Sequence, residues 1–128
     1  MKILIIEDSN TLRYIMVKLL KELGYKDIAA VESAEAAMPL LQSEESYDVL
    51  LLDWKLPQMS GLDLLKQIRS APQLAAMQVI MVTTVHERKN ILQAVQAGIQ
   101  GYIIKPLDSK VLGKKLKEVE ESIAARQG

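Results

Sequence analysis

The stretch Lys2-Ile3-Leu4-Ile5-Ile6-Glu7-Asp8 opens the chain with an apolar run that ends on two carboxylates. Three later stretches repeat this plan: Val49-Leu50-Leu51-Leu52-Asp53, Val79-Ile80-Met81-Val82-Thr83 and Tyr102-Ile103-Ile104-Lys105. Short, almost entirely apolar runs are typical of parallel strands buried on both faces. The carboxyl ends of parallel strands meet at one edge of the sheet, where open α/β sheets bind their ligands. We therefore expect the polar residues that follow these runs to lie together: Glu7, Asp8, Asp53, Thr83 and Lys105.

Between these runs the apolar residues follow the 3.6-residue period of amphipathic helices. The pattern predicts strands at residues 2–6, 26–31, 47–52, 79–82 and 101–104. It predicts helices after Ser9 or Asn10, after Ser33, over 62–68, over 91–95 and after Asp108, with Gly24 and Gly98 as stops. Pro39 should kink the second helix. Five β-α units in alternation predict a doubly wound α/β fold, a parallel sheet with helices on both faces. We see no linker, so residues 1–128 are expected to form a single domain.

Composition excludes several classes of protein. The 16 basic and 16 acidic residues give a net charge of zero, so no long-range field favours nucleic acid or an anionic membrane. The absence of cysteine excludes disulfides and thiolate metal sites, and it suits a reducing compartment. A strand that begins at Lys2 leaves no room for a signal peptide, and no apolar run approaches the roughly 20 residues of a membrane span. We expect a cytoplasmic protein that binds neither nucleic acid nor membrane.

The expected cluster of carboxylates requires a cation. Two like charges ~4 Å apart repel by about 4 kcal/mol at an effective dielectric constant near 20. Hard carboxylate oxygens without His or Cys favour Mg²⁺ or Mn²⁺. Three carboxylates, the ammonium of Lys105 and one divalent ion sum to zero charge. The sequence therefore predicts a site that binds Mg²⁺ and is neutral only when the metal is present.

This combination of groups suits phosphoryl transfer, which needs mainly positioning and charge stabilisation. Asp53 is the best candidate nucleophile because it stands alone at the end of the predicted central strand. Glu7 and Asp8 are better placed as metal ligands, and Lys105 and Thr83 could contact the phosphoryl oxygens.

The chain resembles response-regulator receiver domains, in particular the small stand-alone chemotaxis regulators. The resemblance covers essentially the whole length and rests on four motifs in order: Ile5-Ile6-Glu7-Asp8, Asp53-Trp54-Lys55-Leu56-Pro57-Gln58-Met59-Ser60-Gly61, Val82-Thr83-Thr84 and Gly101-Tyr102-Ile103-Ile104-Lys105-Pro106. It implies the flavodoxin-like, CheY-like (βα)5 three-layer sandwich with strand order 2-1-3-4-5. The Lys105-Pro106 pair also resembles the family, which has a cis peptide bond at this position.

The resemblance implies roles for individual residues. Asp53 would accept a phosphoryl group from a phosphohistidine of a sensor histidine kinase. Mg²⁺ would be held by Asp8, Asp53 and the backbone carbonyl of Lys55, with Glu7 acting through metal-bound water. Thr83 would move to the phosphoryl group while Tyr102 packs inward, switching the surface of the fourth helix, fifth strand and fifth helix for a downstream protein target. No organic cofactor and no enzymatic turnover beyond self-phosphorylation and autodephosphorylation are expected, and the protein should be a monomer.

Some positions depart from the family pattern. Lys55 adds a second ammonium at the rim of the predicted phosphoryl site. Thr84 replaces a smaller residue of the family, and Val85 offers no hydrogen bond to an attacking water. We hypothesise that these three residues slow hydrolysis of the phosphoaspartate. Leu107 replaces a common Phe, which should alter packing only. Trp54 is expected to be partly exposed or else part of the core, and His86 should lie on the surface.

Other functions remain open at this stage. A phosphorelay intermediate would pass the phosphoryl group from Asp53 to a second histidine protein, and the chain could also be excised from a larger regulator or hybrid kinase. A Mg²⁺-dependent aspartyl-phosphate hydrolase is disfavoured because Lys55 stands where such enzymes place a second acid. An FMN carrier is disfavoured because Glu7 and Asp8 would repel phosphate.

The last predicted helix carries lysines toward its start and glutamates toward its end, the reverse of what the helix dipole favours. One interpretation is a solvated face with weak ion pairs. The other is that the lysines meet an acidic partner on the surface near Ile91 and Tyr102. These lysines are Lys110, Lys114, Lys115 and Lys117.

Overall fold

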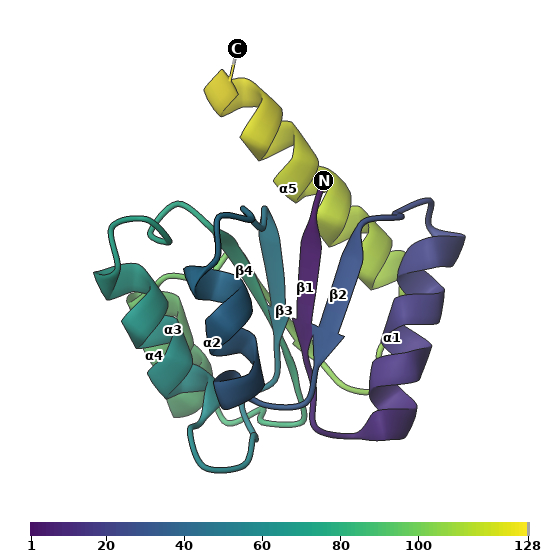
Figure 1. Cartoon of the computed structure of the whole chain (residues 1–128). Helices are drawn as coiled ribbons and strands as arrows, with labels where there is room; N and C mark the ends of the chain where they lie inside the picture. The colour runs from purple at the N-terminus through teal and green to yellow at the C-terminus, as the bar shows by residue number, and fades with distance from the viewer. Residues whose placement is uncertain (128) are drawn as a thin grey trace.

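The structure is a computed structural model that describes residues 1–127, and it confirms the predicted alternation of five strands and five helices (Figure 1). The strands are β1 (Ile3–Ile6), β2 (Ile28–Val31), β3 (Val49–Leu52), β4 (Gln78–Thr83) and β5 (Gly101–Ile104). The helices are α1 (Asn10–Glu22), α2 (Ala34–Gln42), α3 (Gly61–Ser70), α4 (Arg88–Ala97) and α5 (Ser109–Gln127). All neighbouring strands pair in parallel, in the order β2-β1-β3-β4-β5. The doubly wound fold and the strand order expected from the resemblance are therefore confirmed.

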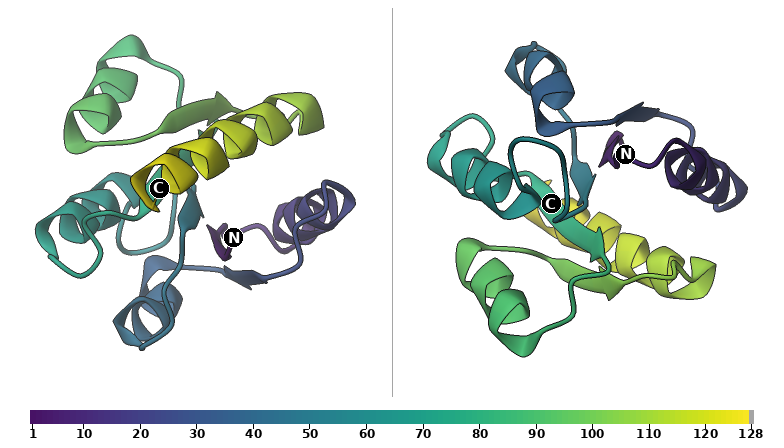
Figure 2. Two further views of the ribbon diagram at one scale, coloured as in Figure 1. Left: turned by 90° about the horizontal axis from the view of Figure 1, so that it is seen from above. Right: turned by 90° about the horizontal axis from the view of Figure 1, so that it is seen from below.

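Two hydrophobic cores lie on the two faces of the sheet, because successive residues of a strand point to opposite sides. Ile3, Ile5 and Leu51 pack with α1 and α5 on one face. Leu4 and Ile6 pack with α2 and α3 on the other, together with Ala94 of α4. The views along the sheet in Figure 2 show this separation of the helices into two outer layers. The burial of β1, β3 and β4 on both faces explains their unbroken apolar sequences.

Serine side chains begin three of the helices. The hydroxyls of Ser9, Ser33 and Ser60 accept hydrogen bonds from backbone N–H groups in the first turns of α1, α2 and α3. The first two caps match the predictions. Gly98, at φ +107°, ends α4 as expected. Pro39 lies within α2, which continues to Gln42.

The register of the strands brings the expected site residues to one edge. Ile6 pairs with Leu52, so Glu7 and Asp53 follow side by side, and the Asp53 N–H donates to the Ile6 carbonyl over 3.2 Å. The Lys105 N–H donates to the Thr83 carbonyl over 2.9 Å across the next pair of strands. The strands end at the lower edge of the sheet in Figure 1, while α5 extends past the opposite, amino edge.

Some apolar residues at helical spacing face outward on three of the helices. Leu92 and Val95 of α4 are 48% and 54% exposed, and small Ala94 is the buried residue of that helix. Val111 of α5 is 51% exposed, and Ile15 of α1 is also exposed. The physical reason is that the apolar residues cover a wider part of each helix than the part that packs against the sheet.

Candidate functional site

Three carboxylates converge at the carboxyl edge of the sheet, as the sequence predicted. One oxygen from each of Glu7, Asp8 and Asp53 lies within 4.8 Å of the others. Glu7 and Asp53 are buried, with 1% and 5% of their surface exposed, whereas Asp8 is exposed. The site is therefore a small acidic cluster with two buried acids and one at the solvent boundary.

Lys105 joins the two buried acids. Its ammonium lies 2.6 Å from Glu7 Oε1 and 2.8 Å from Asp53 Oδ2. Burial raises the pKa of Glu7 above its ordinary value, and hydrogen bonds from Lys105 and the Ser9 N–H offset part of that increase. Burial by itself would lower the pKa of Lys105, but the hydrogen bonds to Asp53 and Glu7 outweigh it and raise that pKa. The lysine is thus held in its charged form between two acids.

The segment after β3 approaches the backbone of Asp53 so closely that only glycine fits at residue 61. A Cβ atom on Gly61 would lie 2.0 Å from the Asp53 carbonyl oxygen. The Gly61 N–H instead donates to the Trp54 carbonyl over 2.8 Å. In the same loop Gln58 has a φ of 67°, a backbone conformation that residues other than glycine seldom adopt. This tight loop fixes the position of Asp53.

Trp54 and Lys55 follow Asp53 at the edge of the acidic cluster. Lys55 is exposed, and its N–H donates to Asp53 Oδ1 over 3.2 Å. Trp54 is half-buried and packs against the core under α2 and α3. Both interpretations of Trp54 therefore hold in part, because its ring is neither fully buried nor free.

Thr83 and Tyr102 meet at the backbone of Val85. The Val85 N–H donates to the Thr83 hydroxyl over 3.3 Å, and the Tyr102 hydroxyl donates to the Val85 carbonyl over 2.5 Å. Thr83 is fully buried, and Tyr102 is half-buried against the core. In residues 1–126 no hydrogen bond joins the Thr83 hydroxyl to the three carboxylates. The two expected switch residues are thus connected to each other through one turn rather than to the acids.

Sequence reasoning missed contributions made through backbone atoms. The Arg13 guanidinium donates to the Glu7 carbonyl over 2.7 Å, and the Ser9 N–H donates to Glu7 Oε2 over 2.9 Å. Backbone donors and acceptors leave no signature in a sequence, although the prediction of Ser9 as a helix cap placed its N–H near Glu7. His86 is exposed as expected, and the Lys105–Pro106 peptide bond is cis.

The donor set of the acidic cluster fits a hard divalent cation. The three nearest donors are carboxylate oxygens, and Lys105 balances one of their three negative charges. Residues 7, 8 and 53 would therefore hold such an ion without a nitrogen or sulfur ligand.

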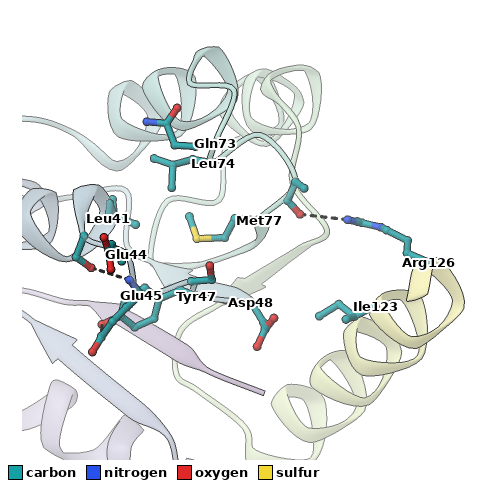
Figure 3. A pocket seen from close by; sticks show the side chains of 13 residues that line it. Leu41, Glu44, Glu45, Tyr47, Asp48, Gln73, Leu74, Met77, Ile123 and Arg126 are labelled. Atoms are coloured by element: carbon teal, nitrogen blue, oxygen red, sulfur yellow. Dashed lines mark hydrogen bonds between the residues drawn. The ribbon is translucent and has the colours of Figure 1, made fainter. Parts of the chain in front are cut away.

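A hollow of about 510 Å³ lies at the opposite, amino edge of the sheet (Figure 3). It is bounded by the segments that precede β3 and β4 and by the end of α5. The residues expected at the phosphoryl site, which are Glu7, Asp8, Asp53, Thr83 and Lys105, do not line it. Lining residues include Glu45, Tyr47, Asp48, Met77, Ile123 and Arg126.

Residues 3–117 match the response regulator receiver domain family. The chain belongs to this family. The receiver domain is 39% identical over 123 residues to the chemotaxis protein CheY of Pseudomonas aeruginosa, covering 96% of this chain and 98% of that protein. It is 38% identical over 123 residues to CheY-3 of Vibrio cholerae, covering 96% of this chain and 94% of that protein.

Solved structures agree with these relatives. The receiver domain matches a CheY-like receiver domain protein of Methanospirillum hungatei with a TM-score of 0.86 and 28% identity, over 99% of this chain and 98% of that one. It matches a receiver domain protein of Clostridium thermocellum with a TM-score of 0.87 and 26% identity, over 97% of each chain. The receiver domain is thus a CheY-like domain of two-component signalling, a signalling domain rather than a classical enzyme.

The receiver domain also exposes apolar side chains on α4, β5 and α5. Leu92, Val95, Ile104 and Val111 are each between 47% and 54% exposed. In residues 1–127 no helix is both long enough and apolar enough to cross a membrane.

Proposed function

We propose that this receiver acts as a stand-alone response regulator whose Asp53 accepts a phosphoryl group from a phosphohistidine of a sensor histidine kinase. The observation that carries the proposal is the Asp53 carboxylate, buried beside two other acids and paired with Lys105 over 2.8 Å. A carboxylate held in one position beside a fixed cation is a suitable nucleophile for an electrophilic phosphorus.

The proposed transfer exchanges one bond to phosphorus for another. An Asp53 oxygen forms a bond to phosphorus as the bond from phosphorus to the imidazole nitrogen breaks, and the imidazole leaves with the electron pair. Lys105 is already positioned to compensate negative charge on the transferred oxygens, since its ammonium contacts Asp53. The Thr83 hydroxyl, once released from the Val85 N–H, would donate to another of these oxygens.

Mg²⁺, or Mn²⁺ in its place, fits the site and would supply charge neutralisation for the carboxylates and the phosphoryl oxygens. In this proposal Asp8 and Asp53 hold the ion with the backbone carbonyl of Lys55, and Glu7 contributes through a bound water. The close positions of the three acids support the proposal.

The output would be a protein contact on the α4–β5–α5 face. Moving the Thr83 hydroxyl away from Val85 would disturb the turn that also holds the Tyr102 hydroxyl. Tyr102 belongs to β5 together with exposed Ile104, and the exposed apolar residues Leu92 and Val111 belong to α4 and α5. An exposed apolar patch of this kind is typical of a surface that binds protein. In this proposal the receiver is a monomer between its kinase and its target.

The direct test is incubation with acetyl phosphate and Mg²⁺, followed by intact-mass measurement and peptide mapping. We expect one added phosphoryl group on Asp53, none in the Asp53→Asn variant, and none when Mg²⁺ is chelated. The Asp63→Asn variant, altered at an exposed acid on α3, serves as the matched control and should be phosphorylated normally. Modification that persists in Asp53→Asn would overturn the assignment.

A further inference from the structure

We propose that the groove between α1 and α5 is a docking site for an acidic segment of a partner protein, distinct from the α4–β5–α5 face. The groove has a volume of about 720 Å³ and lies between the end of α1, with the segment that follows it, and the first half of α5. Figure 1 shows these parts of the two helices beside each other.

The groove has an apolar part where Gly113 of α5 meets Leu23 at the end of α1. A Cβ atom on Gly113 would lie 3.2 Å from Leu23 Cδ2, so the leucine already occupies the space beside the helix. Leu23 is nevertheless 39% exposed. An exposed leucine at the base of a groove is a surface that a partner could cover.

The wall of the groove on α5 is basic. Lys110, Lys114 and Lys117 line it, and their spacing of four and three residues puts them on one face of the helix. All three side chains are exposed, and the ion pairs of residues 1–126 involve other lysines. Their ammonium groups are therefore available to a partner.

The positions of these lysines differ from the sequence-based expectation. Lys115 alone lies toward β5, where its aliphatic chain covers Gly101 and its ammonium pairs with Glu118 over 2.8 Å. Lys110, Lys114 and Lys117 line the groove with α1 instead. Lys110 is also in the first turn of α5, where the helix dipole disfavours a cation. The basic surface and the exposed apolar patch thus belong to different sides of α5.

The shape and charge of the groove favour a short acidic protein segment. Three lysines within eight residues span about 10 Å along a helix, which matches a few acidic side chains. Leu23 and the ring of Tyr25 add apolar surface, which suits a segment with both acidic and apolar residues. Glu120, which accepts a hydrogen bond from the Tyr25 hydroxyl, puts a negative charge at one end of the groove. That charge and the net charge of zero disfavour a long polyanion such as nucleic acid.

The test uses the unphosphorylated full chain labelled with ¹⁵N and a synthetic peptide of about a dozen residues, composed of Asp and Glu with two leucines. We expect saturable amide shifts in residues 23–25 and 109–117. The Lys114→Glu/Lys117→Glu variant should weaken binding about tenfold or more. The control Lys66→Glu/Lys89→Glu, which changes the net charge equally at exposed positions on α3 and α4, should stay within about twofold of the parent.

Three outcomes would overturn the proposal. These are amide shifts that lie elsewhere or do not saturate, equal weakening by both double variants, and equally tight binding of a single-stranded oligonucleotide to the same amides. Circular dichroism of both variants verifies folding, which we expect because the changed residues are exposed. Because the protein is not phosphorylated in this experiment, its result does not depend on whether Asp53 is the phosphoacceptor.

Discussion

A single turn of backbone connects the two residues expected to report the state of the site. The Val85 N–H and carbonyl bind the hydroxyls of Thr83 and Tyr102, so either hydroxyl can leave only by breaking a bond to the same residue. Burial, followed by the charges of Glu87 and Asp53, raises the pKa of Tyr102 from its ordinary value of 10.0 to about 12. The neutral, hydrogen-bonding form of Tyr102 is thus favoured in the folded protein.

This pKa predicts how stability depends on alkaline pH. The folded protein holds the Tyr102 proton more tightly than the unfolded chain, so the contribution is fully present below pH 10 and is lost as pH rises toward 12. Between pH 8 and pH ~11 the parent should lose about 1 kcal/mol more unfolding free energy than Tyr102→Phe, allowing for partial solvent screening. Urea unfolding of both proteins measures this difference, and Tyr25 and Tyr47 contribute equally to each. Equal losses in the two proteins would contradict the prediction.

A second prediction at the residue scale concerns the lifetime of phosphorylated Asp53. Val85 is 8% exposed and has no polar side-chain atom for an attacking water, while exposed Lys55 adds a cation at the rim. We expect slow hydrolysis that becomes severalfold faster in Val85→Glu and in Lys55→Asn. Loss of the phosphoryl group is followed by mass after removal of acetyl phosphate, with Lys66→Asn as a control at an exposed position. A parent half-life of seconds that neither substitution changes would refute the hypothesis.

At the scale of elements, Arg69 of α3 holds together parts of the chain that the sheet does not pair. Its guanidinium donates to the carbonyls of Gly98, Ala75 and Met77 over 2.9, 3.0 and 2.6 Å. It also donates to Gln100 Oε1 over 3.2 Å. Burial, and then the nearby charge of Arg126, lowers its pKa. This side chain thereby fixes the end of α4 and the start of β4 against α3.

Removing Arg69 should therefore destabilise the fold without altering the acidic cluster. We expect Arg69→Ala to lower the unfolding free energy by about 2–4 kcal/mol, because several partly buried carbonyls lose their donor. Denaturant unfolding measures the change, and Arg88→Ala, altered at an exposed position in α4, should have an effect below about 0.5 kcal/mol. Phosphorylation of the folded Arg69→Ala protein should persist. A loss no larger than that of Arg88→Ala would show that the four contacts do not hold these elements.

The strands and the polar residues that follow them were predictable, because burial on both faces makes a strand apolar throughout, as in β1 and β3. The starts of β2 and β3 were each placed two residues early, since residues 26–27 and 47–48 precede the paired segments. The orientation of α4 was not predictable, because Leu92 and Val95 satisfy the helical period and still face outward. Likewise Arg69 and Gly61 act on backbone atoms, and such partners are set only by the folded chain.

At the scale of the whole molecule, the balance of charge at the carboxyl edge should determine stability. Three carboxylates face one ammonium, so the metal-free fold carries uncompensated repulsion at this edge. An ion that binds only the folded chain stabilises it, by about 1.4 kcal/mol when Mg²⁺ is at ten times its Kd. The rest of the chain has 15 basic and 13 acidic residues, so its net charge of +2 gives Mg²⁺ no other strong attraction.

We therefore expect Mg²⁺ to raise the unfolding free energy of the parent, and Asp8→Asn to abolish most of that gain. Asp53→Asn should raise the metal-free stability by about 1 kcal/mol, because Lys105 keeps its pair with Glu7 while one repelling charge disappears. Urea unfolding in Mg²⁺ and in a chelator measures both effects, and half-buried Trp54 provides the fluorescence signal. Asp63→Asn should respond to Mg²⁺ like the parent. If Asp8→Asn gained as much from Mg²⁺ as the parent, or if metal-free Asp53→Asn were less stable, then charge repulsion at this edge would not govern the fold.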